Sequence, residues 1–144
     1  MVNQLMLDAN KNTVRSFVGA VNAKDWPALR RLVAPEFRRH SVAAGEPGVV
    51  SVDDLIQFLE REYSAFPDAF EAIDDIIAEG NKVAVRHRFR GTQLGGLGLH
   101  PPSGKVLEAT YLAIYRVEED RIVEAWAEWD NMAALKQLGH QDMA

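Results

Sequence analysis

The spacing of apolar residues changes once along this chain, near Phe70. Before that point apolar residues recur every three or four positions, which is typical of amphipathic helices. A first helix that begins near Asn3 carries such a stripe, formed by Val14, Phe17, Val18 and Val21. After Phe70 the apolar residues alternate with polar ones, as in half-buried strands. Helices followed by a run of hairpins predict an α+β fold in which helices cover one face of a curved, mainly antiparallel sheet.

Two further helices are indicated by their capping residues. Asp25 can cap a short helix that buries Val33 and ends at Pro35. Ser51, followed three residues later by Asp54, has the spacing of a capping box at the start of the third helix. Three helices are therefore expected before the first strand.

The second half of the chain divides into four expected strands and a final short helix. The strands are rich in β-branched and aromatic residues and cover Ala69–Ala78, Lys82–Arg90, Lys105–Val117 and Arg121–Asp130. The final helix is expected over Met132–Leu138, because Gly139 is typical of the position after a helix end.

Composition limits the class of protein. A chain of 144 residues with 47% hydrophobic content is long enough for one domain, which we expect to span residues 1–144. With 21 acidic and 16 basic residues the net charge is -5, so no nucleic-acid partner is expected. There is no cysteine, which excludes disulfides and thiolate chemistry. The first twenty residues resemble neither a signal peptide nor a membrane span, so a cytoplasmic protein without membrane contact is the expectation.

The segment GTQLGGLGLHPPSG contains five of the ten glycines and a Pro-Pro pair. This composition predicts a specially shaped loop between two strands, which could roof a pocket. A phosphate-binding loop is disfavoured, because no lysine-serine pair ends the segment and no helix is expected after it.

Three segments together resemble a known family. The order AFPD, IIAEGNKVAVRHRFRGTQLGGLGLHPPSGK and RIVEAWAEWDNMAALKQLG resembles the SnoaL-like polyketide cyclases and the broader ester-cyclase group, within the nuclear transport factor 2-like superfamily. The resemblance covers roughly residues 12–139. Its most specific parts are Gly91 to Lys105 and Glu124 to Gly139.

The resemblance implies a cone-shaped α+β barrel, with three N-terminal helices packed on the sheet and one deep apolar pocket enclosed. It also implies homodimers that pair through the outer sheet face, and a cofactor-free ring closure that uses a pocket aspartate and an assisting histidine. Matched without a gap, the aspartate position falls on Ala127 and the histidine position on Ala113. A histidine that often follows Gly-Thr in this loop is Gln93 here. The family's own aldol mechanism is therefore not assumed.

Strand alternation gives the expected pocket wall. On the last strand Ala127 and Trp129 share one face with Val123 and Ala125, and on the preceding strand Tyr111, Ala113 and Tyr115 share another. Small residues that alternate with aromatic ones leave room for a flat ligand. Plain packing of helices close to the sheet explains the alanines equally well.

His87, His40 and Asp130 are the candidate catalytic residues. His87 lies on the apolar face of its strand with Val85 and Phe89, where it could act as a general base or be a hydrogen-bonded core histidine. His40 follows the second helix, where the resemblance implies a pocket-facing polar residue. Asp130 could orient a histidine or a water, or it could cap the last helix.

Two sequence features bear on metals and partners. The four histidines at 40, 87, 100 and 140 show no i, i+4 pair, so neither a metal site nor a metal cofactor is expected. Trp126 would be costly to expose on the opposite face of the last strand. Its burial with Leu112 and Ile114 in a dimer interface is therefore expected.

Two main functions remain open. The first is a cofactor-independent cyclase or isomerase that acts on a polyketide-like or ester-bearing carbon acid. Its base would be His87 or His40, and Tyr111, Tyr115 or Gln93 would hold the enolate. The second is a non-catalytic protein that binds a small hydrophobic or aromatic ligand in the same fold, which the two alanines favour. A weaker third possibility is a hydrolase that activates water with Asp130 and an arginine.

Overall fold

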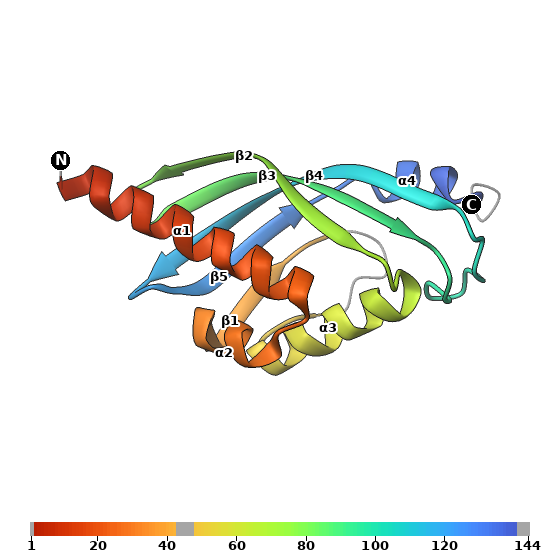
Figure 1. Cartoon of the computed structure of the whole chain (residues 1–144), viewed down its shortest axis with the longest axis horizontal. Helices are drawn as coiled ribbons and strands as arrows, with labels where there is room; N and C mark the ends of the chain where they lie inside the picture. The colour runs from red at the N-terminus through yellow and green to blue at the C-terminus, as the bar shows by residue number, and fades with distance from the viewer. Residues whose placement is uncertain (1, 43–47, 141–144) are drawn as a thin grey trace.

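The computed structural model describes residues 2–42 and 48–140, which form four helices and a five-stranded sheet (Figure 1). The helices are α1 (Val2–Ala23), α2 (Trp26–Leu32), α3 (Val52–Ala65) and α4 (Asn131–Gln137). The strands are β1 (Val33–His40), β2 (Phe70–Glu79), β3 (Lys82–Thr92), β4 (Val106–Glu118) and β5 (Arg121–Glu128). The α+β class expected from the change of period is confirmed.

The predicted helix caps are present. The Asp25 side chain accepts a hydrogen bond from the Ala28 amide at 3.1 Å, and the Ser51 hydroxyl accepts one from the Asp54 amide at 3.0 Å. Each cap satisfies an amide that has no partner within its helix. After α4, Gly139 adopts a φ of +86°, the left-handed conformation that glycine favours at a helix end.

Strand β1 was not predicted. The sequence indicated a second helix that continued through Val33 until Pro35, but α2 ends at Leu32 and Val33 begins a strand parallel to β5. Pro35 disfavours a helical conformation only of Ala34, and the pairing of Val33 with Ile122 accounts for the earlier end of the helix. The partner strand, β5, lies far along the chain, and no local sequence pattern predicts a parallel pair of this kind.

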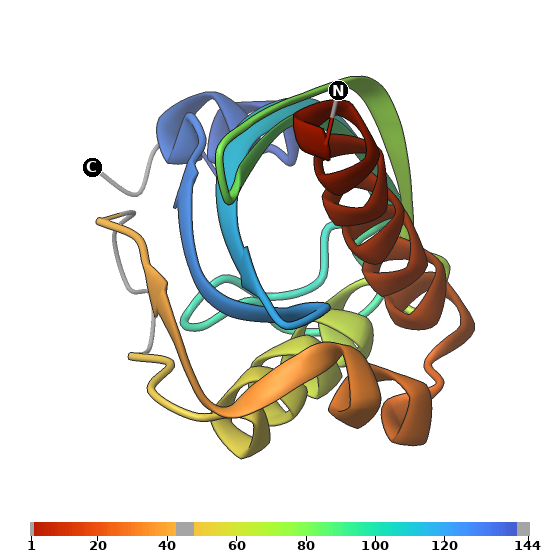
Figure 2. The ribbon, with the colours of Figure 1, turned by 90° about the vertical axis from the view of Figure 1, so that its left-hand side faces the viewer.

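The sheet has the order β1-β5-β4-β3-β2 and is antiparallel except for the β1–β5 pair. It curls into an incomplete barrel (Figure 2), in which α1 lies against β2 and α3 lies against β1. The helices thus cover the side between the two edge strands. Of the helices in the described part of the chain, none is both long and apolar enough to cross a membrane.

The inward faces of β3 and β4 follow the predicted alternation. Residues Val83, Val85, His87 and Phe89 of β3 are buried, as are Leu107, Ala113, Tyr115 and Val117 of β4. On β5, Ala125 and Ala127 are buried as expected, but Ile122 rather than Val123 joins the core. A register shift between Arg116 and Val117 explains the difference, because a one-residue irregularity exchanges the two faces of a strand. Strand β5 ends at Glu128, two residues before the predicted end.

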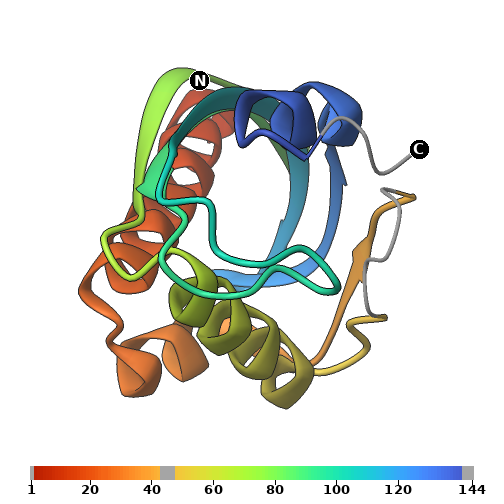
Figure 3. The same ribbon diagram turned by 90° about the vertical axis from the view of Figure 1, so that its right-hand side faces the viewer.

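The glycine-rich segment after β3 runs across one end of the barrel, beside α3 (Figure 3). The amides of Leu94 and Gly95 both donate to the carbonyl oxygen of Ala65, at 3.0 and 3.1 Å. Gly95 has to be a glycine, because a Cβ at this position would lie 2.1 Å from the Ser64 carbonyl oxygen. The loop is therefore fixed to the end of α3.

Candidate functional site: a buried polar cluster on β2, β3 and β4

His87 is the centre of a group of polar side chains inside the barrel. Only 1% of its surface is exposed. Its Nε2 atom lies 2.8 Å from the Tyr115 hydroxyl, and its Nδ1 atom lies 3.5 Å from Glu71 Oε2. The imidazole is thus held between a phenol on β4 and a carboxylate on β2.

Tyr111 completes the group, which we call the polar cluster and define as Glu71, His87, Tyr111 and Tyr115. The Tyr111 ring stacks on the His87 ring, with centroids 4.5 Å apart and planes 12° from parallel. Its hydroxyl donates a hydrogen bond of 2.7 Å to Glu71 Oε1. The two oxygens of one carboxylate therefore face Tyr111 and His87.

The sheet register brings these residues together. His87 on β3 is directly opposite Tyr111 on β4, and Glu71 on β2 is opposite Phe89. The backbone of Glu71 is fixed in addition by Asn22, near the end of α1. The Asn22 side chain accepts from the Glu71 amide and donates to the Glu71 carbonyl, both at 2.9 Å. Strand pairing and a helix end thus determine where the carboxylate points.

The tyrosines of this region remain protonated at neutral pH. Burial, followed by the charge of Glu71, raises the pKa of Tyr111 and of Tyr115 well above the ordinary value. Burial and the charges of Glu62 and Glu71 raise the pKa of Tyr63 to about 12. A phenol that resists ionisation is a hydrogen-bond donor, which is the group needed beside a developing oxyanion.

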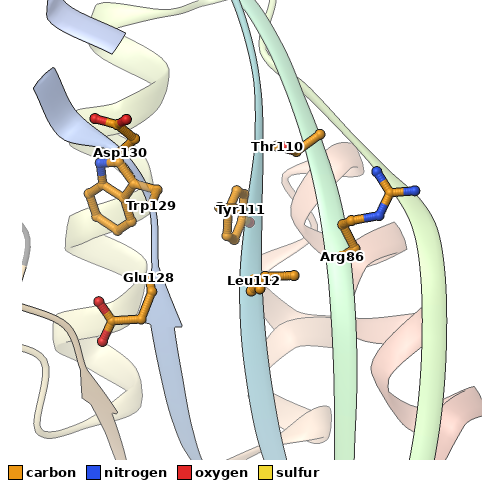
Figure 4. A pocket seen from close by; sticks show the side chains of 7 residues that line it. All are labelled: Arg86, Thr110, Tyr111, Leu112, Glu128, Trp129 and Asp130. Carbon is orange, nitrogen blue, oxygen red and sulfur yellow. The ribbon is translucent and has the colours of Figure 1, made fainter. Parts of the chain in front are cut away.

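An open groove of about 480 Å³ includes Tyr111 of the polar cluster among its lining residues. The β4–β5 ladder ends at the Leu112–Glu128 pair, and beyond it Trp129 lies across the groove from Tyr111 (Figure 4). The other lining residues are Arg86, Thr110, Leu112, Glu128 and Asp130. Tyr111 is therefore shared by the groove and the buried cluster.

Arg39 on β1 adds a positive charge to this region. Its guanidinium carbon lies 4.7 Å from the Phe58 ring centroid and 5.4 Å from the Trp129 ring centroid. Its charge also acts on Tyr115, where it opposes part of the rise in pKa. No sequence pattern singled out Arg39, because the strand that carries it was not predicted.

Ala113 and Ala127 stand where the family resemblance implies the assisting histidine and the catalytic aspartate. They lie directly opposite each other on β4 and β5. Both are buried in the main hydrophobic core. They lie on the same face as Tyr111 and Tyr115 and contribute no polar atom to it.

His40 lies on the outer face of the sheet. Its Nε2 donates to Glu124 Oε2 at 2.6 Å, and its ring stacks on Trp126 at a centroid distance of 5.3 Å. Glu124 and Trp126 alternate along β5 with the buried Ala125 and Ala127. The sheet therefore separates His40 from His87.

Asp130 and Gln93 have structural contacts. The Asp130 side chain caps α4 by accepting from the Ala133 amide at 2.9 Å, although Asp130 also lines the groove. The fully buried Gln93 amide donates to the carbonyls of Gly95 and Pro101, at 3.2 and 3.1 Å. Its carbonyl oxygen lies 2.8 Å from His140 Nε2. Gln93 thus holds the glycine-rich loop together and does not join the polar cluster.

Glu71 is the residue that sequence reasoning missed. Alternation along β2 places it on the same face as Ile73, which pairs with His87. An acidic residue on the inward face of a strand is unusual, and this pattern in the sequence could have identified Glu71 as a site residue. Within residues 2–42 and 48–140, no three histidine, aspartate or glutamate side chains are grouped in a way that could hold a metal ion.

Comparison with known proteins agrees with this architecture. The family model described as SnoaL-like polyketide cyclase matches residues 11–138. Wild-type IdmH from Streptomyces antibioticus, a candidate polyketide cyclase, is 32% identical, with 90% of this chain and 98% of that chain covered and a TM-score of 0.78. AclR from Streptomyces galilaeus, a candidate hydroxylase, is 24% identical, with 92% and 96% covered and a TM-score of 0.78.

A candidate SnoaL-like polyketide cyclase from Jannaschia sp. CCS1 has a TM-score of 0.82 at 21% identity, with 92% of each chain covered. None of the curated proteins matches the chain. The fold is that of the cone-shaped, nuclear transport factor 2-like proteins, with an open five-stranded sheet. The chain belongs to the SnoaL-like polyketide cyclase family.

Proposed function

We propose that this protein is a cofactor-independent cyclase or isomerase that acts on a carbon acid, such as a polyketide-like or ester-bearing ring precursor. The observation that carries the proposal is the polar cluster, in which a buried histidine meets a carboxylate and two phenols. A purely structural interior would not need four polar groups in mutual contact, because burying them is costly unless each is satisfied. The groove between Tyr111 and Trp129 is the proposed ligand entry.

The chemistry requires one base and a set of donors. A carbon between two carbonyl groups is acidic enough for His87 to remove its proton, which leaves an enolate and an imidazolium. When Nε2 takes up the proton it no longer accepts from the Tyr115 hydroxyl, so Tyr115 can turn its hydrogen to the enolate oxygen as charge develops there. Tyr111 keeps its hydrogen bond to Glu71 Oε1. The enolate then attacks a second carbonyl carbon in a cyclase, or regains the proton at another carbon in an isomerase. In both cases the proton on His87 returns to the product, so the enzyme is restored.

The test is proton exchange at the acidic carbon, followed by ¹H NMR in D₂O with a panel of β-keto esters and flat aromatic β-diketones. We expect the wild-type protein to accelerate exchange and His87→Gln to reduce the acceleration by roughly 10²-fold or more, the usual contribution of a general base. His40→Gln is made in parallel as the competing candidate. Loss of exchange in His40→Gln with full exchange in His87→Gln would contradict the assignment.

The alternative is a non-catalytic binding protein for a small hydrophobic or aromatic molecule. It is supported by Ala113 and Ala127, which are apolar where the family resemblance implies the catalytic pair. The same panel separates the two functions. Ligands that shift the NMR signals of Tyr111 and Trp129, with no exchange above the uncatalysed rate for any of them, would favour a carrier or sensor.

We also propose a homodimer that forms through the outer face of the sheet. Leu112 and Ile114 of β4 are 61% and 42% exposed on this face, beside the His40–Trp126 stack. Sedimentation equilibrium of the wild-type protein should give twice the monomer mass, and Ile114→Asp, a change outside the residues that line the groove, should give a monomer. Leu99, which is 93% exposed in the glycine-rich loop, provides the control, and Leu99→Asp should remain dimeric. A monomeric wild-type protein would disprove the interface.

A further inference from the structure

We infer that Glu71 is a positioning residue that holds His87 in the tautomer with its proton on Nδ1, so that Nε2 is the nitrogen that exchanges protons. The inference rests on the proposed function for its catalytic meaning. The tautomer itself follows from contacts that are independent of any substrate.

The donors and acceptors around the imidazole ring favour this tautomer. A neutral imidazole has one donor nitrogen and one acceptor nitrogen, and an ionised carboxylate only accepts. His87 Nδ1 faces Glu71 Oε2 at 3.5 Å, and both atoms are buried without a hydrogen bond to any described residue. If Nδ1 carried the lone pair, two buried acceptors would face each other. With the proton on Nδ1 the contact is attractive, and a small movement would close it into a hydrogen bond.

The other ring nitrogen, Nε2, has a contact that favours the same tautomer. His87 Nε2 lies 2.8 Å from the Tyr115 hydroxyl, which is buried and stays protonated. A phenol has one hydrogen to donate, and an unprotonated Nε2 is the acceptor that satisfies it. Both contacts of the ring are therefore consistent with the same tautomer. The Nε2 lone pair is directed at the hydroxyl that is proposed to meet the enolate.

The Glu71 carboxylate has a fixed orientation. Tyr111 donates to Glu71 Oε1 at 2.7 Å, and Asn22 holds the Glu71 backbone through two hydrogen bonds. The Glu71 side chain is only 11% exposed, so water competes little for its oxygens. When His87 takes up a proton, the positive ring meets a negative carboxylate in a medium of low polarity. Glu71 would thus also stabilise the imidazolium, as the buried acid does in a catalytic triad.

The test is the tautomer of His87, read from ¹H–¹⁵N correlations through two and three bonds in uniformly ¹⁵N-labelled protein at pH 7.5. His87→Gln identifies the signal among those of the four histidines. We expect a pyrrole-type shift for Nδ1 and a pyridine-type shift for Nε2 in the wild type. In Glu71→Leu the Nδ1–H tautomer of His87 should no longer be more populated than the Nε2–H tautomer. In Glu71→Asp the Nδ1–H tautomer should remain the more populated one. A wild-type spectrum of the Nε2–H form would overturn the inference.

Activity gives a second readout in the same variants. In the exchange assay Glu71→Leu should lower the maximal rate at least tenfold with a nearly unchanged KM, and Glu71→Asp should recover part of it. Circular dichroism establishes that each variant is folded. If His87 shows the Nδ1–H tautomer but no carbon acid exchanges, the proposed function fails and the inference about Glu71 stands. If exchange depends on His87 but is equal in all Glu71 variants, the inference fails and the proposed function stands.

Discussion

Removing the Tyr111 hydroxyl tests whether Glu71 is a buried carboxylate. In Tyr111→Phe the ring still stacks on His87, but Glu71 Oε1 loses the donor that lies 2.7 Å away. Because the Glu71 side chain is 11% exposed, water replaces the lost bond poorly. A hydrogen bond to a charged group contributes about 1.5–3 kcal/mol to folding. For a domain of this size that corresponds to a fall in Tm of about 6–12 °C.

Tyr63→Phe is the matched control for this prediction. The Tyr63 hydroxyl also donates a buried bond of 2.7 Å, but its acceptor is the neutral carbonyl oxygen of Val21. A neutral bond contributes about 0.5–1.5 kcal/mol, so this variant should lose roughly half as much stability as Tyr111→Phe. The assay is urea unfolding at pH 7, followed by tryptophan fluorescence, with the slopes of the transitions compared to establish that the unfolded states are alike.

A double-mutant cycle isolates the contact itself. In a Glu71→Leu background the acceptor is gone, so Tyr111→Phe should cost nothing or even stabilise the protein by removing an unsatisfied hydroxyl. The reasoning is refuted if Tyr111→Phe costs no more than Tyr63→Phe, or if its cost is the same with and without the Glu71 carboxylate.

Three further substitutions probe other parts of the structure. Asp130→Ala removes the cap of α4 and should lower the free energy of unfolding by about 1 kcal/mol in urea titrations, and an unchanged midpoint would speak against the cap. Gly95→Ala places a Cβ 2.1 Å from the Ser64 carbonyl oxygen, so the loop should be pushed away from the end of α3. Hydrogen exchange of the loop amides should then accelerate, whereas unaltered protection of these amides would show that the loop can adapt. The hydrogen bond from His40 is the main cause of a lowered pKa of the Glu124 carboxyl, whose ordinary pKa is 4.5. The ionised carboxylate therefore stabilises the fold at pH values above 4.5, and this stabilisation is lost as the pH falls through the lower pKa of the folded state. The advantage of the wild type over Glu124→Gln in unfolding experiments should accordingly shrink below about pH 4.5, and a constant difference down to pH 2 would contradict the linkage.

Much of the candidate site could be predicted because β3 and β4 form a regular ladder. Alternation alone placed His87 on the inward face of its strand and Tyr111 and Tyr115 on that of theirs, and the structure has all three there. Their mutual contacts were not predicted, because these depend on the register between strands. Glu71 was overlooked for a related reason, since a glutamate in a strand is usually solvent-exposed. Its pairing opposite Phe89 confirms the inward direction that alternation with Ile73 indicates.

Local sequence patterns were enough to predict most of the helices, their caps, the hairpins and the faces of the regular strands. Each of these depends on residues within a few positions of one another, so local spacing is sufficient to predict it. Three features became clear only from the three-dimensional structure. Val33 begins a parallel strand, Ile122 replaces Val123 in the core, and His40 contacts Glu124, which lies 84 positions away in the sequence. The first and third features depend on segments that are far apart in the sequence, and the second depends on the register within the β4–β5 hairpin. The free energy of that pairing is a property of the assembled sheet and is not encoded in any short stretch of the chain.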